Sequence, residues 1–137
     1  MQMRITVPNE RERLADLTSA LETVLANHGI EQELVHDVLL IAEEVVCNAM
    51  DHGFQVDAQH EIVVDIALRE QRLHLDFIDD GAPFDPLAQP EPDLDADIAE
   101  RPVGGLGVHL IRELAESVDY RRHEDRNHLS VVLRATR

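Results

Sequence analysis

The fold is decided by residues 42–53, which read AEEVVCNAMDHG and continue the apolar run VLLI at 38–41. Together they predict a helix that is apolar almost all round, and a helix of that kind lies buried in a core. Glu44 and Asn48 nevertheless stand one turn apart on the same stripe of this helix. A carboxylate and an amide in an apolar wall cost free energy unless a partner compensates them.

Two interpretations of this pair follow from its chemistry. Oxygens from Glu44 and Asn48 suit a magnesium ion with its waters, and a carboxylate on that stripe can act as a general base. In the alternative, the two side chains hydrogen-bond to each other and only fix the helix. The helix alone does not decide between them. Glu43 is the weaker candidate, because it points about 100° away and lacks the one-turn relation to Asn48.

Two further segments carry the same kind of signal. A strand-like alternation from Leu73 to Ile78 runs into DDGAPFD at 79–85, and GGLGVHLI at 104–111 takes a glycine cluster straight into a helix. The N–H groups at the start of a helix suit a phosphate chain. Alternatively, the first segment is only a turn and the glycines only allow close packing. The chain has no Gly-x-x-x-x-Gly-Lys sequence, so it is not a P-loop protein.

In this order, the three segments resemble the N, G1 and G2 boxes of the Bergerat-fold (GHKL, histidine kinase-like) ATPases. That group contains gyrase, heat-shock chaperones, histidine kinases and MutL proteins. The Asp-x-Gly-x-Pro-Phe-Asp form at 79–85 and the Gly-Gly-Leu-Gly form at 104–107 are most similar to the RsbW and SpoIIAB anti-sigma factor serine/threonine kinases. The resemblance covers roughly the whole chain and implies ATP or ADP with Mg²⁺ as ligands.

The resemblance also implies a role for each matching residue. Glu44 is the expected catalytic base, and Asn48 is the expected Mg²⁺ ligand. Asp79 is expected to accept a hydrogen bond from the adenine amino group, with Gly81 letting the backbone approach the ring. Asp80 competes with Asp79, but the Asp-x-Gly spacing favours Asp79. The phosphates would be bound by the glycine box: Gly104, Gly105, Leu106 and Gly107.

Three neighbouring residues carry weaker expectations. Phe84 is expected to fill the core, although it could also pack near the base. Asp51 and His52 lie about a turn beyond Asn48, where they could touch the nucleotide or simply end the helix. Both interpretations of Asp51 and His52 stay open at this point.

Composition limits the class of protein. The chain has 137 residues, enough for one domain with a core, and it is 44% hydrophobic but only 3% aromatic. Its formal net charge of -16 argues against binding to nucleic acid or to anionic membranes, and permits a partner with a basic patch. The first residues do not show the basic-then-apolar pattern of a leader, and no apolar run reaches the ~20 residues of a membrane span. We therefore expect a cytoplasmic protein.

Hydrophobic periodicity predicts the order of the elements. Strands are expected at 3–7, 62–68, 73–78, 118–123 and 128–135, with turns at Glu70-Gln71 and at 124–127. Helices are expected at 14–27, 31–53 and 105–117, the last burying Val108, Leu110, Ile111 and Leu114. This order predicts an α/β two-layer sandwich, a mixed and largely antiparallel sheet with helices on one face. The single domain spans 1–137, and the proline-rich, acidic segment 86–103 is expected to be an ATP lid.

The resemblance implies a specific function. The expected protein is an anti-sigma regulator that phosphorylates a serine or threonine of a STAS-type anti-anti-sigma protein and holds a sigma factor inactive. A homodimer is implied only by the same resemblance. The alternative is a nucleotide-dependent binding module that sequesters its partner without efficient phosphoryl transfer. The presence of both Glu44 and Asn48 favours the enzyme, because a pure binding module has less need of a base.

Overall fold

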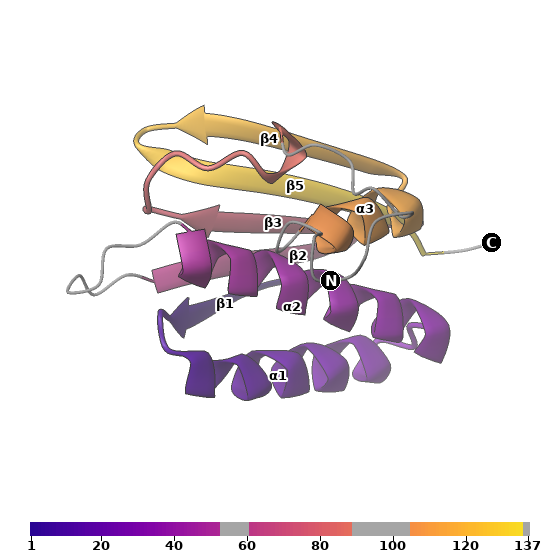
Figure 1. The fold of residues 1–137 in the computed structure, drawn as a ribbon. Helices are drawn as coiled ribbons and strands as arrows, with labels where there is room; N and C mark the ends of the chain where they lie inside the picture. Colours follow the sequence, from indigo (N-terminus) through magenta and orange to yellow (C-terminus); the bar gives the residue numbers. More distant parts are fainter. Residues whose placement is uncertain (53–60, 89–104, 136–137) are drawn as a thin grey trace.

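The computed structural model describes residues 1–52, 61–88 and 105–135, and these form two layers (Figure 1). Three helices cover one face of a five-stranded sheet. In chain order the elements are β1 (Gln2–Pro8), η1 (Arg11–Arg13), α1 (Leu14–Asn27), α2 (Gln32–His52), β2 (Glu61–Arg69), β3 (Arg72–Asp79), η2 (Pro86–Ala88), α3 (Gly105–Leu114), β4 (Ser117–His123) and β5 (Arg126–Arg134).

The sheet has the strand order β1-β2-β3-β5-β4, and every pairing between neighbours is antiparallel. The expected two-layer α/β class is therefore confirmed. The mixed character of the sheet is not seen between neighbours in the described part of the chain. The reason is topological, because β5 is antiparallel to both β3 and β4 and separates these two strands, which run in the same direction.

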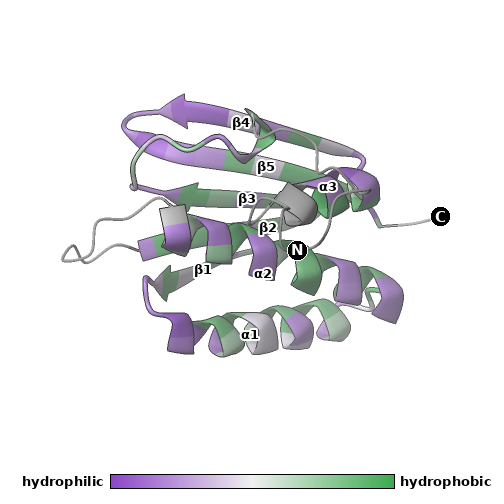
Figure 2. Ribbon diagram, viewed as in Figure 1, coloured by the Kyte–Doolittle hydropathy of each residue, from purple (hydrophilic) through white to green (hydrophobic). Residues whose placement is uncertain are grey.

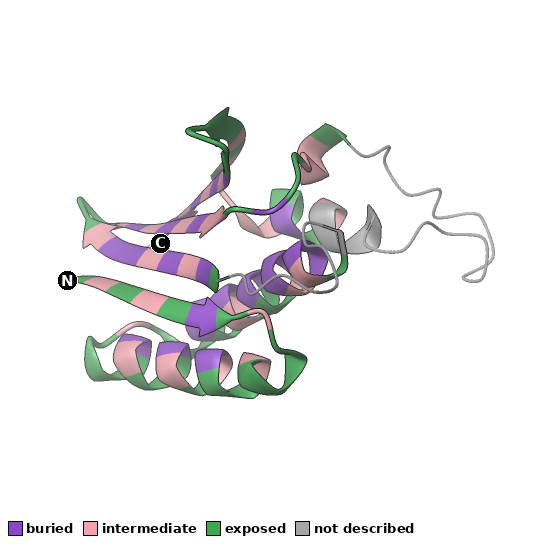
Figure 3. Cartoon of the chain, turned by 90° about the vertical axis from the view of Figure 1, so that its left-hand side faces the viewer, coloured by how far each residue is buried: buried purple, intermediate pink, exposed green. Residues whose placement is uncertain are grey.

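The core lies between the sheet and the helices, and the strands alternate accordingly. Every second residue of the three central strands is buried and faces the helices: Ile62, Val64, Ile66, Leu73, Leu75, Phe77, Leu129, Val131 and Leu133. Figures 2 and 3 show the resulting pattern, in which none of the described helices lies on the opposite face of the sheet. The one-sided cover predicted from period-two alternation is confirmed.

The helices bury stripes rather than whole surfaces. Helix α1 buries Leu17, Leu21 and Leu25 at four-residue spacing. Helix α2 is less completely buried than its sequence suggested, because Leu40 lies on the solvent side and is 37% exposed. In α3, Ile111 is buried as expected, but the expectation for Leu110 is wrong, since it is 38% exposed. None of the helices described is long and apolar enough to cross a membrane.

Two tight turns set the register of the hairpins. The β2–β3 turn is formed by Glu70 and Gln71, and the β4–β5 turn by Glu124 and Asp125, and all four have positive φ angles of 50–65°. Two consecutive residues with positive φ are typical of the turns that match the twist of antiparallel strands. The expected turn at Glu70-Gln71 is confirmed. The second turn is shorter than the predicted 124–127, because β5 already begins at Arg126.

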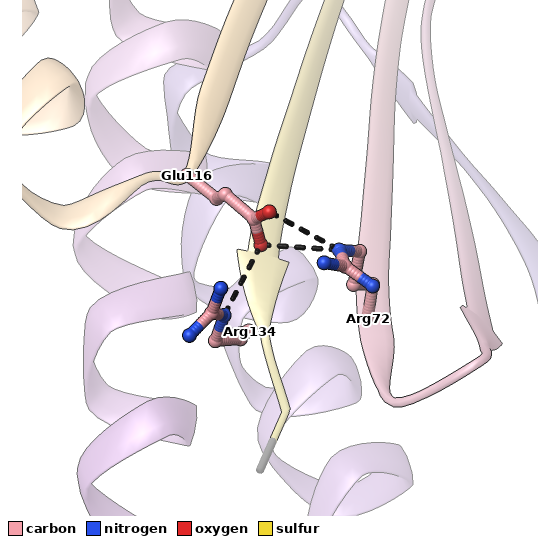
Figure 4. Close-up of polar contacts among 3 residues, drawn as sticks. All are labelled: Arg72, Glu116 and Arg134. Atoms are coloured by element: carbon pink, nitrogen blue, oxygen red, sulfur yellow. Dashed lines mark hydrogen bonds and ion pairs between the residues drawn. The ribbon is translucent and has the colours of Figure 1, made fainter. Parts of the chain in front are cut away.

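An ion cluster joins strand ends on the side of the sheet remote from the β4–β5 turn (Figure 4). Glu116, which precedes β4, accepts hydrogen bonds at 3.2 Å from Arg72 of β3 and lies 3.6 Å from Arg134 of β5. Arg72 holds the pKa of Glu116 below its ordinary value. These side chains are largely exposed, so the cluster contributes less to stability than the apolar core.

The Glu70-Gln71 turn yields a prediction about stability. A side chain in the left-handed region costs about 1–2 kcal/mol, and glycine avoids that cost while losing about 0.5–1 kcal/mol of chain entropy. The double change Glu70→Asn and Gln71→Gly should therefore raise the free energy of unfolding by about 1 kcal/mol, measured by urea denaturation. Ligand binding at the far end of β3 should not change. A lower midpoint would show that the present turn is not strained.

Candidate functional site

A pocket opens where the second half of α2 meets the ends of β3, β4 and β5. Its wall is mostly apolar and includes Ile111 from α3. The lining residues are Val45, Asn48, Ala49, Phe77, Asp79, Phe84, Pro86, Ile111, Tyr120, Asn127 and Leu129. An apolar pocket with a few converging polar groups is the usual form of a small-molecule site. Asn48 and Asp79, which were singled out in two separate sequence segments, lie in this one pocket.

Asn48 faces the pocket from α2 and is 7% exposed. Glu44, one turn earlier, is half-buried, and burial raises the pKa of its carboxyl above the ordinary value. A hydrogen bond from Asn48 opposes that rise, while the negative charge of Glu43 adds to it. Glu43 itself is exposed, and neither Glu43 nor Glu44 is among the residues that line the pocket. The two interpretations of the pair are thus compatible, because Asn48 can donate its N–H to Glu44 and keep its oxygen for a cation.

The described residues include no group of three or more His, Cys, Asp or Glu side chains that could hold a metal ion. A cation bound beside Asn48 would therefore take most of its ligands from phosphate oxygens and water. Mg²⁺ binds in this way, since it keeps several waters and needs few protein ligands. The donor set fits Mg²⁺ held together with a nucleotide better than a metal held by the protein alone.

Asp79 ends β3 at the pocket, and one of its oxygens is firmly engaged. Oδ1 accepts hydrogen bonds from the Gly81 backbone N–H at 3.0 Å and from Asn127 Nδ2 at 2.9 Å. Oδ2 accepts no hydrogen bond from the described residues and is available to a ligand. Asp80 is exposed and lies outside the lining of the pocket. Of the two neighbouring aspartates, Asp79 therefore lines the pocket and Asp80 does not.

Sequence reasoning missed Asn127, which is the most connected side chain in the pocket. It is 6% exposed. Its Nδ2 donates to Asp79 Oδ1 and to the Ala82 carbonyl, both at 2.9 Å. Its Oδ1 accepts from Tyr120 Oη at 2.6 Å and from the Phe84 N–H at 3.3 Å. The sequence pattern placed Asn127 in a turn. Only a prediction that started the last strand at Arg126 would have put Asn127 on the helix-facing side of the sheet.

Two aromatic side chains complete the wall. The Tyr120 ring lines the pocket from β4, and its hydroxyl group is used by Asn127. Phe84 was expected in the core, and this is wrong, because it is half-buried at the pocket and outside the central cluster. The reason is a tertiary contact: Asn127 bonds to the backbone of Ala82 and Phe84, which keeps Phe84 at the rim of the core.

The remaining candidates are only partly placed. Helix α3 starts at Gly105, as predicted, and runs through Leu106 and Gly107, while Gly104 lies outside the described residues. Most of the expected lid at 86–103 also lies outside them. Asp51 is paired with Arg11 of η1, so its observed contact is structural. The side chain of His52 is not among those described.

The chain was compared with proteins of known sequence and structure. The family described as the histidine kinase-like ATPase domain matches residues 7–133. The serine/threonine-protein kinase BtrW of Bordetella bronchiseptica is 30% identical over 114 residues, covering 82% of this chain and 79% of BtrW. The serine-protein kinase RsbW of Bacillus subtilis is 25% identical over 126 residues, covering 88% of this chain and 78% of RsbW.

Solved structures agree on the fold. The RsbU and RsbW domains of a Mycobacterium tuberculosis protein match with a TM-score of 0.73 and 19% identity, over 100% of this chain and 33% of that one. A histidine kinase domain from Erythrobacter litoralis matches with a TM-score of 0.58 and 18% identity, over 89% of this chain and 59% of that one. The pocket, the fold and the family match lead to one conclusion: the chain belongs to the histidine kinase-like ATPase family, as an RsbW-type member.

Proposed function

We propose that the protein is an ATP- and Mg²⁺-dependent serine/threonine kinase that regulates a sigma factor. The observation that carries the proposal is the meeting of Asn48, from α2, and Asp79, from β3, in one apolar pocket. Relatives named as serine-protein kinases support the phosphotransfer chemistry. The proposed substrate is a STAS-type anti-anti-sigma protein. Sigma-factor binding and a homodimer are proposed from the same resemblance.

Adenine would enter the apolar end of the pocket. Asp79 Oδ2 is the acceptor that an amino group on the base requires, since Oδ1 already has two donors. The buried backbone of Gly81 next to this carboxylate carries no side chain, which permits close approach of the ring. The phosphates would then extend toward Asn48 and toward the start of α3, whose N–H groups favour anions.

Phosphoryl transfer would take place beside Glu44. The partner's hydroxyl oxygen forms a bond to the γ-phosphorus while the bond from that phosphorus to the ADP oxygen breaks. The hydroxyl proton passes to the Glu44 carboxylate, and ADP leaves. Mg²⁺ bound at Asn48 would neutralise charge on the phosphate oxygens. A base and a metal ligand on one helix stay in fixed relation to each other, which favours an enzyme over a binding module.

The first prediction concerns adenine recognition. In Asp79→Asn, the donors Gly81 N–H and Asn127 Nδ2 must still face the side-chain oxygen, so the new NH₂ group points at the adenine amino group. Two facing donors should weaken ADP binding by about 10- to 100-fold, measured by calorimetry. Asp80→Asn removes the same charge outside the pocket and should bind normally. Unchanged affinity in Asp79→Asn would contradict the assignment of the pocket.

The second prediction concerns the base. Glu44 must be ionised to accept a proton, so the phosphorylation rate should fall as the pH is lowered through the Glu44 pKa. Because that pKa is raised, the fall should begin at a higher pH than for an ordinary glutamate. Glu43→Gln removes a negative neighbour and should lower the Glu44 pKa, which moves the acidic limb of the pH–rate profile to lower pH. Glu22→Gln, an exposed change of equal charge on α1, should leave the profile in place. Glu44→Ala should lose ~10²–10⁴-fold in rate.

The third prediction separates the kinase from the binding module. Asn48→Ala should keep partner binding but lose most Mg²⁺-dependent phosphate transfer to a single Ser or Thr of a STAS-type partner, because the metal loses its protein ligand. Transfer of radiolabel from ATP is the measurement, and partner binding is followed in the same samples. A wild-type protein that binds the partner tightly and transfers no phosphate would favour the binding module instead.

A further inference from the structure

Arg122, an exposed residue of β4, makes two hydrogen bonds that the proposed function does not use. Its Nη1 donates to the Gly81 carbonyl at 2.7 Å and to Asn127 Oδ1 at 3.2 Å. Gly81 lies beside Asp79 in the loop that follows β3, 41 residues earlier in the chain. The loop that would read adenine is thus held from outside the pocket by a side chain of a different strand.

The contacts of Arg122 close a ring of four hydrogen bonds. The Gly81 N–H donates to Asp79 Oδ1, and Asn127 Nδ2 donates to the same oxygen. Arg122 connects the two remaining groups, because it donates both to the Gly81 carbonyl and to Asn127 Oδ1. Both polar backbone groups of Gly81 are therefore occupied by side chains. The N–H belongs to the peptide unit before the Gly81 Cα and the carbonyl to the unit after it, so each of the two units is held by one bond of the ring.

The sheet register explains why these residues meet. Arg122 is the cross-strand partner of Asn127, and Asn127 is the cross-strand partner of Asp79. Side chains of cross-strand partners lie on the same face of a sheet. The three residues thus form one row across β4, β5 and β3, on the face toward the helices. The positively charged Arg122 stands at the β4 end of this row. Asp79, the proposed ligand of adenine, stands at the β3 end.

We propose that Arg122 is a positioning residue for nucleotide recognition: its guanidinium fixes the peptide unit that follows the Gly81 Cα and the Asn127 amide, and thereby the direction of Asp79 Oδ2. This rests on the proposed nucleotide function. Arg122 is not among the residues that line the pocket. Its removal should therefore weaken the part of nucleotide affinity that depends on the adenine amino group. Breaking this ring of hydrogen bonds would leave the apolar lining of the pocket intact.

The neighbouring Arg121 offers a matched control. It is exposed, occupies the opposite face of the same strand, and pairs in register with His128 on the uncovered side of the sheet. It donates no hydrogen bond to the adenine loop among the described contacts. Removing either arginine changes the net charge of this acidic chain equally, so long-range repulsion of an anionic nucleotide changes to a similar extent. Any difference between the two variants reports on the bonds of Arg122.

The experiment measures the dissociation constants of ADP and of inosine diphosphate, which lacks the amino group, for wild type, Arg122→Ala, Arg122→Lys and Arg121→Ala. Arg122→Ala should weaken ADP binding about tenfold and inosine diphosphate binding much less, because a bond from a charged donor is lost. Arg122→Lys should recover part of the loss through the Gly81 carbonyl. Arg121→Ala should match wild type for both ligands.

Two results would overturn the proposal: Arg122→Ala binding ADP as wild type does, or losing both ligands by the same factor. Failure of the wild type to bind ADP would instead overturn the proposed function. Hydrogen exchange of the Gly81 amide in the ligand-free protein gives an independent reading. That amide should exchange faster in Arg122→Ala than in Arg121→Ala. Equal exchange rates would count against the ring of hydrogen bonds. This measurement also applies if Arg122→Ala is too unstable for calorimetry.

Discussion

The buried amide of Asn127 is the constraint on which the rest of the site depends. An amide taken out of water costs several kcal/mol unless its donors and acceptor are paired. Here Nδ2 has two acceptors and Oδ1 has donors from a phenol, a backbone N–H and Arg122. A fully paired network in a low-dielectric setting is rigid, and its loss is costly because several groups lose partners at once. The direction of the Asp79 carboxylate is a consequence of that pairing.

This arrangement requires one register of the C-terminal hairpin. A shift of one residue would turn Asn127 to the uncovered face of the sheet and bring an outward-facing neighbour into the pocket. The register is set by the two-residue turn at Glu124 and Asp125, whose φ angles of 52° and 61° lie in the region that favours glycine. The strained backbone of the exposed Glu124-Asp125 turn therefore sets the register that places Asn127 in the pocket.

Electrostatics place a second constraint on the site. The chain has a formal net charge of -16, and all twelve of its basic Lys or Arg positions are arginines. None of them lines the pocket in the described part of the chain. Under the proposed function, a polyphosphate would enter an acidic protein without an arginine from the described lining of the pocket. Under the same proposal, magnesium and backbone N–H groups would supply positive charge to the phosphates.

The sequence by itself determined the class of fold and the order of its parts. Period-two alternation identified the central strands, four-residue spacing identified the helices, and Glu44, Asn48 and Asp79 stood out as polar groups in apolar segments or at a strand end. These features are local, since each is read within a window of one helix or strand. The same local reading erred at Leu110, whose exposure depends on what packs against α3.

Only the tertiary structure decided how the site is held together. The bonds from Arg122 and Asn127 to the 79–84 segment span 41–48 residues of chain, and no spacing rule links residues so far apart. These residues meet because β5 lies between β3 and β4, and because the β4–β5 turn has two residues where the sequence predicted four. The sequence therefore singled out candidate polar groups within single elements, whereas strand register, a property of paired strands, decided which other side chains bond to them.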